Sequence, residues 1–172
     1  TVRIDGLDSL YQPVVQTVTL NGLTAVAIPF PLMRINNAVV VTAGADRVNA
    51  GKLSIRAAGG GAVYSIIPKD LGTVSQAWYT VPAGVVGAVV PYYRWTLNRP
   101  TADAWAEVSI WRQVDGVVRY SNIIGLSAGG PLYNAILKVG TPLAEKTDLA
   151  LRVQDVSADG IRAVSGGTFH PR

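Results

Sequence analysis

The sequence predicts an all-β protein, specifically an antiparallel β-sandwich of jelly-roll type. Apolar and polar residues alternate in many short runs, and clusters of glycine, proline, asparagine and aspartate separate these runs. No window of eleven or more residues carries the period of an amphipathic helix. The spacing corresponds to roughly a dozen short strands, as in a sandwich or jelly roll.

Residues 51–84 show the pattern most plainly. Apolar residues alternate through 53–57, three glycines reverse the chain, and alternation resumes at 63–67. This pattern predicts a β-hairpin. A third strand is predicted at 77–81, closed by Pro82-Ala83-Gly84, in which proline fixes φ and glycine permits positive φ.

The first fifty residues predict a hairpin and two further strands. Residues 1–5 and 14–20 are alternating runs that a long loop would join. Asn21-Gly22 suits a type I′ turn, in which both central residues need positive φ, and residues 24–28 would then be the returning strand. Residues 33–43 form a longer apolar run that predicts another strand.

The second half of the chain shows the same pattern of strand-like runs separated by turn residues. Residues 85–98 predict a long strand, and Pro91 inside it implies a bulge or an edge position because proline donates no hydrogen bond to a neighbouring strand. Residues 104–114 and 117–124 flank Asp115-Gly116, which predicts a two-residue hairpin turn. Further strands are predicted at 132–139, 148–156 and 161–169.

The length of 172 residues fits a single domain, residues 1–172. Two packed sub-units, 1–50 and 51–172, are the alternative. The chain opens at Thr1 directly in a strand-like run, which suggests the carboxy-terminal part of a longer polypeptide.

The composition argues against several classes of protein. Hydrophobic residues make up 49% and charged residues 15%, well below the roughly one quarter of an ordinary soluble domain. Part of the surface is therefore expected to meet other protein, unless a large sandwich core accounts for the apolar excess. The net charge of +4 comes from scattered basic residues, so no nucleic-acid partner is expected. The chain has no cysteine, and no apolar run is long enough to span a membrane.

No combination of residues predicts catalysis, a metal site or a cofactor. Residues 155–160 match the first half of a calcium loop, but the twelfth position is Gly166 in place of glutamate. Asp103 and Glu107 would lie about 13 Å apart along one strand, which suits solvated charges better than an acid pair. His170 is the only histidine and lies close to the end of the chain. We therefore expect a protein without enzymatic activity.

The aromatic residues are the candidate interaction site. Trp105 and Trp111 share the more polar face of the strand at 104–114, and Tyr93 and Trp95 form a similar pair on the preceding strand. Tryptophan in such a place serves as a sugar-stacking platform, as the anchor of a protein interface, or as the contact to a covering segment. All three roles remain open at this point.

Four segments in order carry a resemblance to a known group of proteins. These are IDGLD at 4–8, TVTLNG at 17–22, VNAG at 48–51 and YTVPAG at 79–84, and the similarity continues through 143–152. In this order they resemble virion structural proteins of tailed bacteriophages. The alanine at position 50 departs from the tighter turn of that family, which affects the local loop.

The resemblance implies a β-rich accessory part of the phage particle with no enzymatic activity and no cofactor. Members of the family are longer at the amino end. The expected role is head decoration or a head fibre that stabilises the capsid in the virion, after assembly in the bacterial cytoplasm. The expected partners are further copies of the chain, with a trimer favoured, and other virion proteins such as the capsid shell. The alternative is a tail or fibre adhesin that binds host carbohydrate through the face of Trp105 and Trp111.

Overall fold

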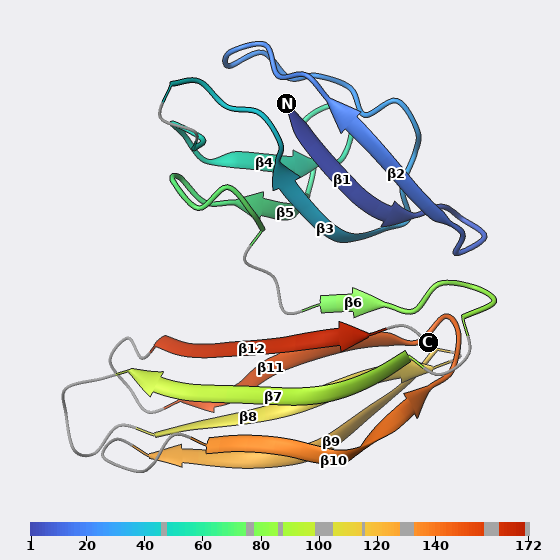
Figure 1. Cartoon of the computed structure of the whole chain (residues 1–172), viewed down its shortest axis with the longest axis vertical. Coiled ribbons are helices and arrows are strands. Elements are labelled where there is room, and N and C mark those ends of the chain that lie inside the picture. Colours follow the sequence, from blue (N-terminus) through green and yellow to red (C-terminus); the bar gives the residue numbers. More distant parts are fainter. Residues whose placement is uncertain are drawn as a thin grey trace. The chain divides into compact units, whose positions relative to one another are not determined.

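The structure is a computed structural model that describes residues 1–45, 48–74, 78–85, 88–98, 105–114, 116–127, 133–156 and 162–170. These residues form antiparallel β-sheets joined by turns, and none of them is helical (Figure 1). The prediction of an all-β protein is therefore confirmed for the described part of the chain.

The chain divides into two compact units, Thr1–Gln76 and Ala77–Arg172, hereafter unit 1 and unit 2. The sequence favoured one domain, with a division between residues 50 and 51 as the alternative. The hairpin that follows residue 51 belongs with the amino-terminal strands, because Ile67 lies in the same apolar cluster as Val2 and Ile4.

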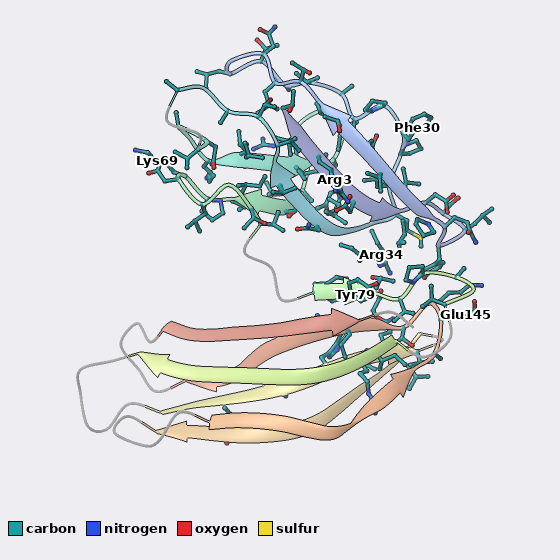
Figure 2. The ribbon with its side chains drawn as sticks, viewed as in Figure 1. Arg3, Phe30, Arg34, Lys69, Tyr79 and Glu145 are labelled. Atoms are coloured by element: carbon teal, nitrogen blue, oxygen red, sulfur yellow. The ribbon has the colours of Figure 1, made fainter. Side chains whose placement is uncertain are left out.

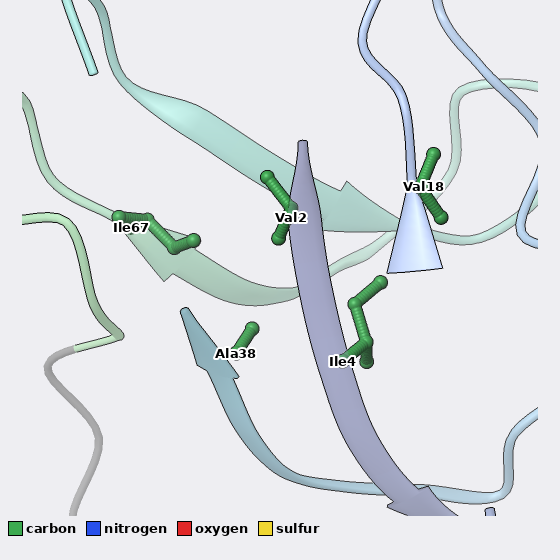
Figure 3. Packing of buried hydrophobic residues seen from close by; sticks show 5 residues of the cluster. All are labelled: Val2, Ile4, Val18, Ala38 and Ile67. Carbon is green, nitrogen blue, oxygen red and sulfur yellow. The ribbon is translucent and has the colours of Figure 1, made fainter. Parts of the chain in front are cut away.

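Unit 1 contains a three-stranded sheet in the order β2-β1-β3 and the two-stranded hairpin β4-β5. Inward-facing residues of both sheets form one core, in which Val2, Ile4, Val18, Ala38 and Ile67 are buried (Figure 3). Alternation along each strand places these side chains on the inner face. The strands of unit 1 are β1 (Val2–Leu7), β2 (Pro13–Val18), β3 (Arg34–Val40), β4 (Leu53–Arg56) and β5 (Val63–Ile67).

The predicted turns of unit 1 are found with one correction. β1 pairs with β2, and β4 pairs with β5 around Gly59 and Gly60, both of which have positive φ. The turn after β2, however, has Gly22 and Leu23 at its centre, with Asn21 bridged to Thr24. Only Gly22 has positive φ, as in a type II′ turn, so the predicted type I′ turn is one residue out of place.

The predicted returning strand at 24–28 is also wrong. After Thr24 the chain runs without strand pairing up to β3. Ile28 and Leu32 instead pack against the core. Two prolines in this segment, Pro29 and Pro31, explain why it does not form a ladder, since neither has a backbone N–H.

A buried amide holds the loops of unit 1 together. Asn49 donates from Nδ2 to the carbonyl oxygens of Gly51, at 2.8 Å, and Pro68, at 2.7 Å, and its Oδ1 accepts from the Gly72 N–H at 2.9 Å. The Asp70 N–H donates to the Asn49 carbonyl oxygen. This one side chain therefore replaces the backbone pairing that two adjacent irregular segments lack.

Replacing Asn49 by alanine is expected to lower the free energy of unfolding of unit 1 by about 2 to 3 kcal/mol, because the three part-buried hydrogen bonds of this buried side chain are lost together. Urea denaturation followed by circular dichroism measures the change. The matched control is Asn21→Ala, at an exposed amide in a turn, which is expected to cost less than about 0.5 kcal/mol. Equal losses for the two variants would contradict the role given to Asn49.

Unit 2 contains two sheets, with strand orders β10-β7-β12 and β6-β11-β8-β9. Val114 pairs with Val117 across the predicted two-residue turn, and Gly116 in that turn has positive φ. The strands are β6 (Trp78–Thr80), β7 (Ala88–Asn98), β8 (Trp105–Val114), β9 (Val117–Ser127), β10 (Tyr133–Leu143), β11 (Asp148–Val156) and β12 (Arg162–His170).

Pro91 lies within β7, which is the central strand of its sheet. The pairing with β10 shifts between Ile136 and Thr141, and the pairing with β12 shifts between Thr168 and His170. Of the two predicted settings for Pro91, the bulge is confirmed and the edge position is wrong. An irregularity on both sides lets a residue without an N–H lie in a central strand.

Candidate functional site

A pair of tryptophans in unit 2 forms the best-defined aromatic cluster of the described residues. The strand register places Trp78 of β6 and Trp111 of β8 on either side of Ala150 of β11. The small alanine side chain lets the two indoles meet above it, with ring centroids 4.9 Å apart and an angle of 37° between their planes. Such tilted pairs stabilise a fold beyond their buried area.

A cation covers this cluster. The guanidinium of Arg152 lies 4.3 Å from the ring centroid of Trp111 and 6.0 Å from that of Trp78. Arg152 is two residues beyond Ala150, so alternation places both on one face of β11. The geometry is that of a cation–π contact, in which the arginine keeps part of its surface in water.

A short chain of hydrogen bonds continues from the cluster toward the end of the sheet. The Trp78 Nε1–H donates to Thr80 Oγ1 at 3.2 Å, and the Thr80 hydroxyl donates to Asp148 Oδ1 at 2.6 Å. Thr80 is fully buried and Asp148 is 4% exposed. Because each polar atom has a partner, the low local dielectric strengthens the chain and fixes β6 on β11.

The predicted candidate Trp111 is only 5% exposed in this cluster. Of the three roles considered for it, the burial favours an internal contact, which is made with Trp78 of β6 and Arg152 of β11 in the same sheet. The other candidates lie at strand positions whose side chains are outside the described part. Trp105 pairs with Ser127, Tyr93 pairs with Ala135 and Gly167, and Trp95 pairs with Tyr133 and Ser165.

Tyr79 lies on the opposite face of β6 from Trp78 and pairs with Leu149 (Figure 2). Burial raises the pKa of its phenol above the ordinary value of 10.0. Burial thus strengthens the preference of the phenol for its neutral form.

The residues considered for chemistry are placed only in part. Glu107 is exposed on β8 and is paired with Asp155 of β11 and Gly125 of β9, whereas Asp103 and residues 157–160 of the calcium-like loop lie outside the described residues. His170 pairs with Val89 at the end of β12. Within the described ranges, no group of three or more His, Cys, Asp or Glu residues could hold a metal ion. The same ranges contain no helix long and apolar enough to cross a membrane.

Unit 1 has a feature that the sequence interpretation missed. Residues 9–33, hereafter the neutral segment, contain no Asp, Glu, Lys, Arg or His, and all ten charged residues of unit 1 lie outside it. Ordinary protein surface carries about a quarter to a third charged residues. The segment nevertheless exposes large apolar side chains, which are Leu10, Val15, Leu20, Leu23, Val26, Phe30 and Met33. A scan for the longest uncharged run would have found it.

The neutral segment is held in place by Gln16 of β2. Its buried side chain donates from Nε2 to the Phe30 carbonyl oxygen and accepts at Oε1 from the Phe30 N–H, both at 3.0 Å. The amide thus pairs with Phe30 as a neighbouring strand would. Ile28 and Leu32 pack against the core while the Phe30 ring, between them in sequence, remains 62% exposed (Figure 2).

Leu23 lies at the centre of the Gly22-Leu23 turn, the most exposed point of the segment. Its exposure is 107% of the reference value for leucine, so neighbouring residues shield none of it. The Thr24 N–H donates to the Asn21 carbonyl oxygen at 3.0 Å and closes the turn below it. The leucine side chain is therefore fully exposed at the tip of a closed turn.

Comparison of the chain with protein-family models, with curated proteins and with solved structures finds no match in any of the three.

Proposed function

We propose that the protein is a non-enzymatic structural component of a bacteriophage particle, which decorates or braces the capsid through contacts with copies of itself and with other virion proteins. The observation that carries this proposal is the exposed, uncharged apolar surface of the neutral segment. The resemblance of the sequence to phage virion proteins is the reason that the proposal names a bacteriophage particle.

Exposed apolar surface is costly for a protein that acts alone. A large apolar side chain that passes from full exposure to full burial in a contact stabilises that contact by about 1.5 to 3 kcal/mol. Surfaces of this kind, depleted of charge at the centre, are typical of protein–protein interfaces. A structural protein of an assembly would bury such a surface in its contacts with neighbouring proteins.

We infer a jelly-roll sandwich for unit 2 from the order in which its strands pair. The pairs are nested around the β8–β9 turn: β8 pairs with β9, β7 with β10, and β6 with β11. Successive pairs alternate between the two sheets. A long double hairpin wound into two sheets in this way is the pattern of a jelly roll, an architecture found in viral capsid proteins among others.

The proposal is tested by labelled-antibody electron microscopy of intact phage particles, with tailless heads as a second sample. We expect regular labelling of the head in both samples. Absence of the label from purified particles would contradict the proposal. Labelling confined to the tail tip, together with binding to host polysaccharide, would favour the adhesin alternative.

A further inference from the structure

We propose that the neutral segment is the surface through which the protein associates with a second copy of itself. This inference rests on the proposed function and names the partner of the same surface. The argument uses the charge, the area and the rigidity of the segment.

Charge favours a second copy over a charged partner. Around a symmetry axis, equivalent residues of different copies face each other, so any charge near the axis meets its own kind. Like charges that face each other across an interface cost several kcal/mol. The neutral segment ends at Asp8 on one side and Arg34 on the other and has no charge between them. On the neighbouring strand Asp5 lies opposite Val15 of the segment and forms an ion pair with Arg3 at 2.8 Å, so the segment and this pair together carry no net charge. The segment can therefore meet its own copy with little repulsion, and it offers little to attract a strongly charged molecule.

The exposed area is close to that of a stable contact. We take the accessible area of a fully exposed large apolar side chain as on the order of 150 Å², the lower end of the range for aromatic side chains. With the exposed fractions of the segment's large apolar residues, their total exposed area is roughly 600 Å². A standard interface buries about 800 Å² on each partner. A contact that covered all of these side chains would therefore take most of such an interface from the apolar atoms of the segment, with its backbone and polar groups forming the rest.

The segment is also rigid before it binds. Gln16 fixes Phe30 through two hydrogen bonds, and the closed turn between Asn21 and Thr24 fixes Leu23. Ordering a loop on association weakens binding, and a segment that is already ordered avoids that cost. Leu23 and Phe30 are the two side chains that we expect to contribute most to the contact.

The test replaces exposed side chains by glutamate and measures the mass of the 172-residue chain by light scattering over a range of concentrations. The variants are Leu23→Glu and Phe30→Glu. The matched control is Tyr64→Glu on β5, because Tyr64 is 66% exposed and lies outside the neutral segment. Circular dichroism shows that each variant keeps its fold; Leu23 has no buried surface to lose, so it remains informative if Phe30→Glu unfolds.

We expect the wild type to have at least twice the 18.1 kDa mass of the single chain, in a whole-number multiple. Each variant of the segment should raise the dissociation constant about tenfold or more, while Tyr64→Glu leaves it unchanged. A monomeric wild type at micromolar concentration would overturn the inference, as would an oligomer that Tyr64→Glu alone disrupts. If the protein labels phage heads yet is monomeric, only the self-association fails. If it self-associates but is absent from particles, the proposed function fails instead.

Discussion

Replacing Trp111 by alanine is expected to lower the free energy of unfolding of unit 2 by about 3 to 5 kcal/mol, the usual cost of removing a buried large aromatic side chain. The ring is 5% exposed, it contacts Trp78, and it lies beneath the Arg152 guanidinium. Its removal leaves a cavity under Arg152 and beside Trp78 that small residues such as Ala150 do not fill. Urea denaturation followed by circular dichroism measures the loss without relying on tryptophan fluorescence.

Two further variants separate the contributions to this effect. Trp111→Phe keeps an aromatic ring and should cost about 1 to 2 kcal/mol, since the cavity is smaller. Arg152→Ala removes the cation and leaves both indoles, and should cost about 0.5 to 1 kcal/mol. A loss of less than about 1 kcal/mol for Trp111→Ala would show that the ring is not packed as described. Because of this structural role, loss of glycan binding by Trp111→Ala would not by itself identify a sugar site.

Replacing Gly6 by alanine is expected to cost about 3 kcal/mol in unit 1, at the upper end of the range for overpacked sites. Gly6 lies in β1 at a shift in the pairing with β3. A Cβ at this position would overlap the carbonyl oxygen of Arg34 and would lie 3.0 Å from Cδ1 of Leu32. The oxygen belongs to the backbone of the neighbouring strand, so relief requires the two strands to separate. Thermal unfolding of unit 1 reports the change.

The control for Gly6 is Gly44→Ala. A Cβ at Gly44 would have no atom within 4 Å, and this glycine does not have positive φ. Its replacement should change the stability by no more than about 0.5 kcal/mol. If Gly6→Ala were as mild as Gly44→Ala, the close approach of β1 and β3 at the bulge would be contradicted.

The features that depend on a few adjacent residues could be predicted from the sequence. The Asp-Gly pair at 115–116 and the three glycines after Ala58 mark hairpins, and Gly116, Gly59 and Gly60 have the positive φ that such turns require locally. Asn21-Gly22 shows the limit of this reasoning. A glycine with positive φ fits the first central position of one turn type and the second of another, so the dipeptide alone does not fix which residues are central.

The features that depend on distant residues could not be predicted. Alternation places Trp111 on one face of its strand, but the ring that it contacts, Trp78, lies some thirty positions earlier in the chain, on a strand that joins the same sheet through β11. The role of Asn49 could not be predicted for the same reason, because the path of the turn at Pro68 determines its hydrogen-bond partners. Local sequence shows a polar residue in a loop and does not show what surrounds it.

The neutral segment could be predicted from the sequence, because its lack of charge needs no structure to be seen. A prediction of single strands does not show it, since the absence of charge extends over the whole of residues 9–33. The low charge content predicts that part of the surface meets other protein, and the aromatic pattern places this surface in unit 2. Among the residues whose side chains the structure describes, Leu23 and Phe30 of unit 1 are exposed, while Trp111 is buried.

Hydroxyl-radical footprinting of the assembled protein tests the central claim most directly, because leucine, phenylalanine and methionine side chains are oxidised according to their exposure to solvent. The chain is oxidised once as diluted, dissociated protein and once as the assembled oligomer, and the rates at each residue are compared. We expect Leu23, Phe30 and Met33 to be oxidised rapidly in the dilute sample and to be protected on assembly, with Tyr64 and Leu71 unchanged. Protection at Tyr64 and Leu71 with continued oxidation of Leu23 would contradict the claim.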